Sequence, residues 1–140
     1  MANETVKCAA LSDEELQRLA KAAWDVREHS YIIGTTKVGC AVLCSDGAIY
    51  SGCNVEHRYR CHDVHAEVNA ITTMVGTGGS RQIRAIVIAA ERERFTPCGG
   101  CMDWIMQFVE NGSCTIAIQS TPNGSLKCFT VDQLMPFYPK

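Results

Sequence analysis

The residues best suited to chemistry in this 140-residue sequence stand in two short motifs, His65-Ala66-Glu67 and Pro97-Cys98-Gly99-Gly100-Cys101. The imidazole of His65 and the thiolates of Cys98 and Cys101 are three ligands of the kind that zinc binds in proteins. Zinc prefers four ligands in a tetrahedron, so three protein ligands would leave one position for water. Zinc lowers the pKa of a bound water to roughly 7, and such a site could supply hydroxide near neutral pH.

Glu67, close behind His65 in the sequence, adds a proton carrier to this group. Both motifs are expected at helix N-termini, which favour a thiolate over a thiol. In this order the motifs match the His-x-Glu and Pro-Cys-x-x-Cys pattern of zinc deaminases, in which the glutamate is not a zinc ligand. Glu67 would therefore take a proton from the water and return it to the substrate nitrogen and to the departing ammonia.

Three other interpretations of these residues stay open from the sequence alone. Cys61, or His62 beside it, precedes His65 closely enough to act as a fourth protein ligand, which would close the metal site and make it structural. The cysteine pair could have a redox function, although that function offers no role for the histidine and glutamate. Glu67 could also be an ordinary acidic residue in the first turn of a helix.

The remaining cysteines have simpler interpretations. The sequence holds nine cysteines, and an odd count without a secretory signal argues against a disulfide framework. Cys8 lies in the N-terminal lead-in and is expected to be inert. Five others lie in apolar, strand-like runs, where cysteine behaves as a small hydrophobic residue of the core: Cys40, Cys44, Cys53, Cys114 and Cys128.

The hydrophobic pattern predicts the helices and strands that position the motifs. Ser12-Asp13-Glu14-Glu15 reads as a capping box that begins the first helix. Glycines at 76, 78 and 79 are expected to end the second helix, and Asn111-Gly112 the third. Strands interleaved with helices favour a sheet covered on both faces. We expect helices over 13–28, 64–75, 99–110 and 131–134, and strands over 38–44, 48–53, 84–90, 114–119 and 125–130.

Length and composition favour a single domain over residues 1–140, with residues 1–12 as a lead-in. No run approaches the roughly 20 apolar residues of a membrane span, so we expect no membrane association. The polar start, residues 1–5, does not resemble a signal peptide, and we expect a cytoplasmic protein. The formal net charge is −2, whereas proteins that bind nucleic acid usually carry an excess of positive charge, so we expect no nucleic-acid partner.

With these motifs in hand, the chain resembles the cytidine deaminase family in its short, single-domain form. The resemblance covers the sequence from about Val38 to the C-terminus and includes Gly52-Cys53-Asn54-Val55-Glu56 and Leu134-Met135-Pro136. It implies an α/β class of fold, with three α/β/α layers around a five-stranded mixed sheet. It also implies one zinc ion per subunit, a homotetramer with shared active sites, and a role in pyrimidine salvage. The implied reaction converts cytidine or deoxycytidine to the uracil nucleoside with release of ammonia.

The resemblance also assigns roles to residues outside the zinc group. Asn54 and Glu56 would hydrogen-bond the ribose, while the backbone at Ala66, with Glu67, would read the polar edge of the pyrimidine. Asn54 and Glu56 are two positions apart at the end of an expected strand, so their side chains share a face. An amide and a carboxylate together suit a sugar diol.

The sequence departs from the family pattern at positions that we expect to lie near the pocket. The family usually has Cys at the position of His65 and Arg at the position of Val68. We interpret these two changes as coupled, because zinc with three thiolates carries a negative charge that a nearby cation offsets, whereas zinc with two thiolates and an imidazole is neutral. Thr36 replaces a Phe that packs on the base, and Met102-Asp103 replaces Arg-Gln.

These departures concern residues that would contact the substrate, so they open alternatives for the substrate and not for the reaction. Alternatives are a modified cytosine nucleoside, a nucleoside antibiotic such as blasticidin S, or a free base. A nucleic-acid deaminase would need a basic rim built from the arginines, and a non-catalytic zinc-fold binding protein would not need Glu67. Phe137 and Tyr138 either reach a neighbouring subunit's site or cover the core of their own subunit.

Overall fold

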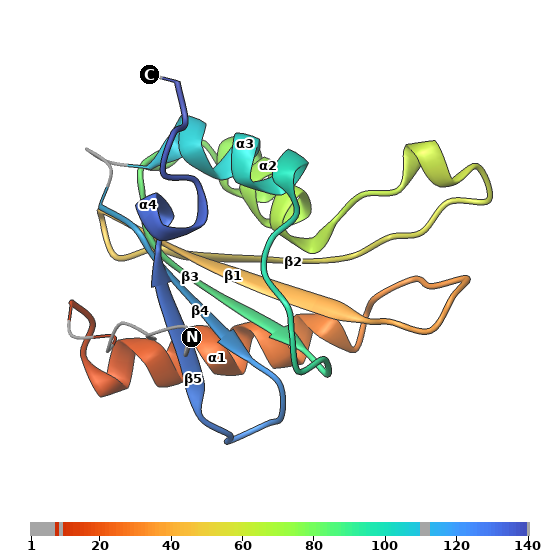
Figure 1. The fold of residues 1–140 in the computed structure, drawn as a ribbon, viewed down its shortest axis with the longest axis horizontal. Helices are drawn as coiled ribbons and strands as arrows, with labels where there is room; N and C mark the ends of the chain where they lie inside the picture. Colours follow the sequence, from red (N-terminus) through yellow and green to blue (C-terminus); the bar gives the residue numbers. More distant parts are fainter. Residues whose placement is uncertain (1–7, 9, 110–112, 140) are drawn as a thin grey trace.

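The computed structural model describes residue 8 and residues 10–109 and 113–139. Helices and strands alternate along most of the chain, in the order expected from the sequence (Figure 1). The helices are α1 (Asp13–Arg27), α2 (Ala66–Thr77), α3 (Gly99–Phe108), α4 (Val131–Leu134) and the single 3-10 turn η1 (Arg60–His62). The strands are β1 (Val38–Cys44), β2 (Ile49–Cys53), β3 (Ile83–Ala90), β4 (Thr115–Gln119) and β5 (Leu126–Thr130).

The five strands form one mixed sheet in the order β2-β1-β3-β4-β5. Strands β3 and β4 are parallel, and the other neighbouring pairs are antiparallel. The parallel pair needs a crossover connection, and the segment between β3 and β4 contains α3. The expectation of a five-stranded mixed sheet is confirmed.

Both faces of the sheet are covered by helices (Figure 1). Alternate side chains of β1 point to opposite faces, as in any strand. Cys40 and Val42 differ by two positions and join one core cluster, with residues of α2, α3 and α4. Ala41 and Leu43 join the other cluster, with residues of α1. The layers are therefore α/β/α, and the catalytic motifs begin two helices of the same layer.

Most element boundaries lie within two residues of those expected, and the largest difference concerns α2. This helix begins at Ala66 rather than at residue 64, because the backbone of Val64 is already bonded to Val55 in an antiparallel bridge. His65 is the N-cap, in an extended conformation. Gly76 lies inside the helix instead of ending it, and Gly78 provides the left-handed C-cap. Residues 111–112, the expected stop of α3, fall outside the described residues, but α3 already ends at Phe108, because Val109 is extended and forms a bridge with Ile83.

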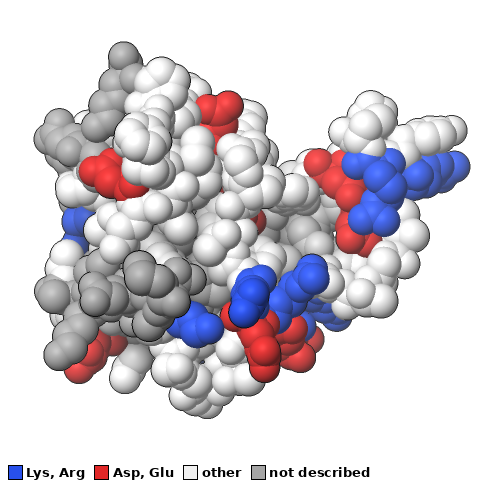
Figure 2. Space-filling model, in the orientation of Figure 1, with Lys and Arg blue, Asp and Glu red and all other residues white. Residues whose placement is uncertain are grey.

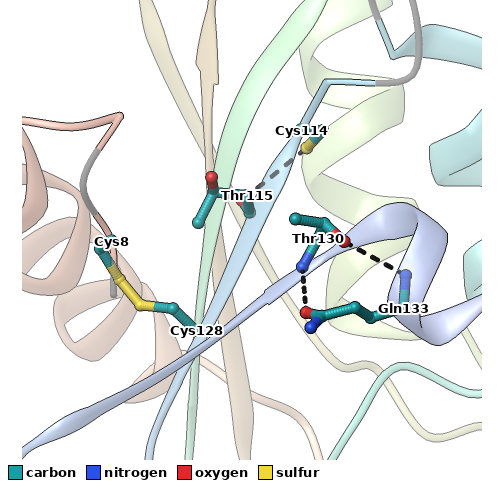
Figure 3. Close-up of a disulfide and its surroundings, with 6 residues drawn as sticks. All are labelled: Cys8, Cys114, Thr115, Cys128, Thr130 and Gln133. Atoms are coloured by element: carbon teal, nitrogen blue, oxygen red, sulfur yellow. Dashed lines mark hydrogen bonds between the residues drawn. A yellow bond between two sulfur atoms is a disulfide. The ribbon is translucent and has the colours of Figure 1, made fainter. Parts of the chain in front are cut away.

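One pair of cysteines corrects the sequence interpretation. Cys8 and Cys128 form a disulfide, with their Cα atoms 5.7 Å apart (Figure 3). Cys8 is therefore not inert, and Cys128 is more than core filler. The sequence pattern could not show this pair, because it depends on the lead-in returning to β5 across a separation of 120 residues. Cys40, Cys44, Cys53 and Cys114 are free and buried, as expected.

A loop that we call the arm, residues 54–65, extends from the end of β2 and returns to the start of α2 (Figure 1). Its two ends are held together by the bridge between Val55 and Val64, and Val55 also pairs with Tyr31 from the loop that follows α1. The arm contains η1. None of the described helices is both long and apolar enough to cross a membrane.

Candidate active site

The first turns of α2 and α3 bring the two sequence motifs together. His65 is the N-cap of α2, and Cys98 is the N-cap of α3, with Cys101 in the first turn of the same helix. The Nδ1 atom of His65 lies 3.2 Å from Sγ of Cys101 and 3.5 Å from Sγ of Cys98. All three ligand atoms lie within 4.8 Å of one another. The three residues predicted as zinc ligands therefore form one compact group.

The donor set and its spacing fit zinc. A tetrahedral zinc with bonds of about 2.0 Å to nitrogen and 2.3 Å to sulfur would hold those two atoms about 3.5 Å apart. The two nitrogen–sulfur distances in the site lie close to that value. Burial raises the pKa of the Cys101 thiol, and the nearby Glu67 raises it further. A cation is the partner that would favour the thiolate here, so binding of zinc is coupled to release of a proton.

The arm does not add a fourth ligand to this group. Cys61 lies in η1 and is exposed and free. In the described part of the chain, the clustered metal-ligating side chains are His65, Cys98 and Cys101. This arrangement favours the interpretation in which the site keeps a position for water over the closed structural site.

Glu67 lies in the first turn of α2, one residue beyond Ala66, and only 3% of its surface is exposed. Burial raises the pKa of its carboxyl, while its own backbone N–H, the Cys101 side chain and His65 lower it to a smaller extent. A buried carboxyl with a raised pKa holds a proton more readily than a free carboxyl, which suits a group that both accepts and donates a proton in general acid–base catalysis. Glu67 also lines the cavity beside the metal group. This position favours a role in proton transfer over the interpretation as an ordinary acidic residue of the first turn.

A cavity of about 220 Å³ opens beside the metal group, and it is smaller than the roughly 300 to 1,000 Å³ of most ligand pockets. The sequence-predicted residues that line it come from the arm and the two helix starts: Asn54, Glu56, His65, Ala66, Glu67 and Cys98. Thr36 also lines the cavity, as expected from its position before β1.

Two positions of departure from the family pattern are placed elsewhere. Met102 is buried in the core formed by α2, α3 and the sheet. Asp103 is exposed and accepts a hydrogen bond from the hydroxyl of Tyr138 at 2.8 Å. The expectation that residues 102 and 103 line the pocket is wrong, because the first turn of α3 directs them away from it. Tyr138 packs against its own core, whereas Phe137 is 95% exposed.

The Asn54 side chain holds the wall of the cavity in place. Its Oδ1 accepts from the backbone N–H of Val38 at 2.8 Å, and its Nδ2 donates to the carbonyl of Thr36 at 2.9 Å. Asn54 is buried, so these bonds satisfy polar groups that water does not reach freely. A carboxamide has two N–H donors, and one is left for a ligand.

Glu56 makes a denser set of bonds. Its Oε1 accepts from the backbone N–H groups of Ile33 and Gly34, at 2.6 and 2.7 Å. Its Oε2 accepts from Nη2 of Arg60 at 3.0 Å. The N–H groups of Gly34 and Ile33 lower the pKa of the Glu56 carboxyl, so that it is ionised near neutral pH. An ionised carboxylate has acceptor positions left over for a hydroxyl donor.

Sequence reasoning missed several residues that line the cavity: Arg60, Asp63, Val64, Arg92, Phe95 and Thr96. Phe95 and Thr96 directly precede the Pro97-Cys98 motif, and this proximity was the available signal. Phe95 brings an aromatic side chain to the cavity, which the sequence lacks at position 36. Arg60 and Asp63 gave no such signal, because their role depends on how the arm folds back on itself.

Comparisons with known proteins agree with this geometry. The family model described as "Cytidine and deoxycytidylate deaminase zinc-binding region" matches residues 13–117. A protein named cytidine deaminase from Sporosarcina psychrophila is 32% identical over 124 residues, which cover 87% of this chain and 89% of the relative. The crystal structure of a cytidine deaminase from Mycobacterium leprae has a TM-score of 0.72 at 29% identity, covering 86% of this chain and 97% of that one. A structure from Burkholderia pseudomallei, at 24% identity, has a TM-score of 0.76 and covers 91% and 98% of the two chains, which supports the fold.

Proposed function

The chain belongs to the cytidine and deoxycytidylate deaminase family and is a zinc-dependent hydrolytic deaminase, and we propose that its substrate is a cytosine nucleoside, cytidine or deoxycytidine. The product would be the corresponding uracil nucleoside, with release of ammonia. The observation that carries the proposal is the buried carboxyl of Glu67 in the same small cavity as His65 and Cys98. A binding protein would have no use for a buried proton carrier beside a metal group.

The proposed catalytic residue is Glu67, and His65, Cys98 and Cys101 would hold one zinc ion per chain. When bound, the zinc makes a water acidic enough to act as the nucleophile near neutral pH. Glu67 would take a proton from the attacking water on a carboxylate oxygen and deliver it to the ring nitrogen of cytosine, while the water oxygen bonds to the ring carbon that carries the amine. It would then move the remaining proton of the new hydroxyl group to the amine nitrogen, the carbon–nitrogen bond would break, and the products would be the uracil nucleoside and ammonia.

Substrate binding would use other residues that line the same cavity. Glu56, with its remaining acceptor position on Oε2, and Asn54, with its remaining N–H donor, suit the hydroxyl groups of a sugar. The backbone at Ala66 lies at the start of α2, between the metal ligand and Glu67, where it can bond the polar edge of the base. Phe95 offers an apolar surface in the same cavity.

The remaining parts of the proposal concern assembly and location. We propose a homotetramer, because several of the large hydrophobic side chains that are exposed gather on the arm and the loop that pairs with it, and patches of this kind mark interaction surfaces. These residues are Tyr31, Ile33, Val55, Tyr59 and Val64. We further propose that residues 1–140 form a single domain and that the protein is cytoplasmic and acts in pyrimidine salvage. We propose no membrane partner.

The distribution of charged side chains on the surface is less consistent with a nucleic-acid substrate than with a free nucleoside. Lys and Arg alternate with Asp and Glu on the face shown in Figure 2, including on the arm. Arg60 is paired with Glu56 and Asp63, and Arg84 is paired with Glu15. Paired arginines contribute little to a phosphate-binding surface, which depends on unneutralised positive charge.

Ammonia release across a panel of amino-heterocycles tests the proposal. The panel would include cytidine, deoxycytidine, methylated cytidines, cytosine, guanine, adenosine and blasticidin S, with the Glu67→Ala variant as control. We expect the highest kcat/KM for cytidine or deoxycytidine and no release by the variant. A higher kcat/KM for another member of the panel would change the substrate, and release by the variant at the wild-type rate would remove Glu67 from the mechanism.

A further inference from the structure

Arg60 joins two carboxylates that approach the cavity from different parts of the arm. Its Nη2 donates to Oε2 of Glu56 at 3.0 Å, and its Nε donates to Oδ2 of Asp63 at 2.9 Å. All three residues line the cavity. The side chains of Glu56 and Asp63 are mostly buried, at 12% and 16% exposed, while that of Arg60 is 54% exposed. The guanidinium thus covers two carboxylates from the solvent side.

The bonds of these carboxylates extend to the surrounding backbone. Oδ1 of Asp63 accepts a hydrogen bond from the N–H of His57 at 2.7 Å, which connects the outgoing and returning segments of the arm. Oε1 of Glu56 accepts from Ile33 and Gly34, which ties the arm to the loop after α1. Arg60 therefore stands at the centre of a network that fixes where the Glu56 carboxylate lies.

The geometry of this network limits what the Glu56 carboxylate can do. Two backbone donors occupy Oε1, and Arg60 occupies one acceptor position of Oε2, so an incoming hydroxyl has the remaining position of Oε2. A planar guanidinium fixes the direction of that position, because its Nε and Nη2 groups contact two different carboxylates at once. A lysine has a single ammonium on a flexible stem and cannot reproduce this fork.

We propose that Arg60 is a positioning residue, which makes the enzyme selective for substrates with sugar hydroxyls by fixing the acceptor oxygen of Glu56. This inference rests on the proposed function, because it requires a nucleoside in the cavity. Arg60 touches no reacting atom and would act only through Glu56. Its loss would therefore weaken binding of the sugar without altering the chemistry at the metal group.

The test compares cytidine with 2′,3′-dideoxycytidine, which lacks both hydroxyls of the sugar diol. Steady-state ammonia release would be measured for the wild type, Arg60→Gln, Arg60→Lys and Arg58→Gln. Arg58 is a matched control, since it lies on the same arm and makes no ion pair within the part of the chain that the structure describes. Urea denaturation of each variant checks that the fold is retained.

We expect Arg60→Gln to raise KM for cytidine about tenfold with little change in kcat, the size expected for a lost hydrogen bond to a charged group. We expect kcat/KM for the dideoxy analogue to change less than about twofold, and we expect the KM for cytidine in Arg60→Lys to lie between those of the wild type and Arg60→Gln. An equal fall for both substrates, or the same effect in Arg58→Gln, would overturn the inference. Absence of ammonia from cytidine with the wild type would instead overturn the proposed function.

Discussion

Gly52 on β2 does not line the cavity, but we expect that its substitution by alanine, which adds one methyl group, would displace residues of the site. A Cβ added to Gly52 would lie 2.2 Å from the backbone nitrogen of Ala70 and 2.6 Å from the carbonyl carbon of Asn69, both in α2. Backbone atoms cannot rotate away as a flexible side chain can. Gly52→Ala must therefore push α2 off the sheet by about 1 Å before the contact becomes ordinary.

The size of the effect follows from what α2 carries. Overpacking of a well-packed core typically costs 1–3 kcal/mol, and we expect Gly52→Ala at about 3 kcal/mol because the clash is with backbone. The shift would also strain the bond from the N–H of Cys53 to Oδ1 of Asn69, which is 2.9 Å long. His65 and Glu67 move with the helix, and a misplacement of about 1 Å can cost about 100-fold in rate.

Urea denaturation and ammonia release measure the two consequences separately. Gly76→Ala is the matched control, because Gly76 lies in the same helix and a Cβ there meets nothing within 4 Å. The control should gain about 0.5–1 kcal/mol from reduced backbone entropy and keep its activity. If Gly52→Ala lost less than about 0.5 kcal/mol and kept wild-type activity, the close approach of β2 and α2 would not be a property of the protein.

Three further substitutions test separate parts of the account. Ser12→Ala removes the capping box of α1 and should lower the free energy of unfolding by about 1 kcal/mol in urea, and an unchanged value would mean that the cap contributes nothing. Cys61→Ser should leave the zinc content unaltered by atomic absorption, whereas loss of zinc would make Cys61 a ligand. His65→Cys should give a slow or zinc-poor enzyme that Val68→Arg partly restores, because the added thiolate makes the metal group negative. Equal ammonia release by the single and double variants would refute that coupling.

The site residues that could be predicted from the sequence are those that belong to short motifs. His65, Cys98 and Cys101 were found as a metal group because few functions need those three types at that spacing, and the structure brings them together. Core periodicity placed the helices and strands to within about two residues, since buried positions repeat at intervals fixed by backbone geometry. Local signals of this kind do not depend on the rest of the fold.

Features that depend on long-range contact were not predictable in the same way. The start of α2 was misplaced because Val64 pairs with Val55, a contact that the helical pattern does not encode. The disulfide from Cys8 to Cys128 and the network around Arg60 likewise join segments whose proximity appears only in three dimensions.

The most direct test of the central claim is a paired measurement on Glu67→Gln, of zinc content and of ammonia release from cytidine. Gln has nearly the shape of Glu but cannot carry the proton, and residue 67 is outside the metal group. We predict one zinc ion per chain, as in the wild type, and a rate lower by about 100-fold to 10,000-fold. A zinc-loaded variant that releases ammonia at the wild-type rate would contradict the account.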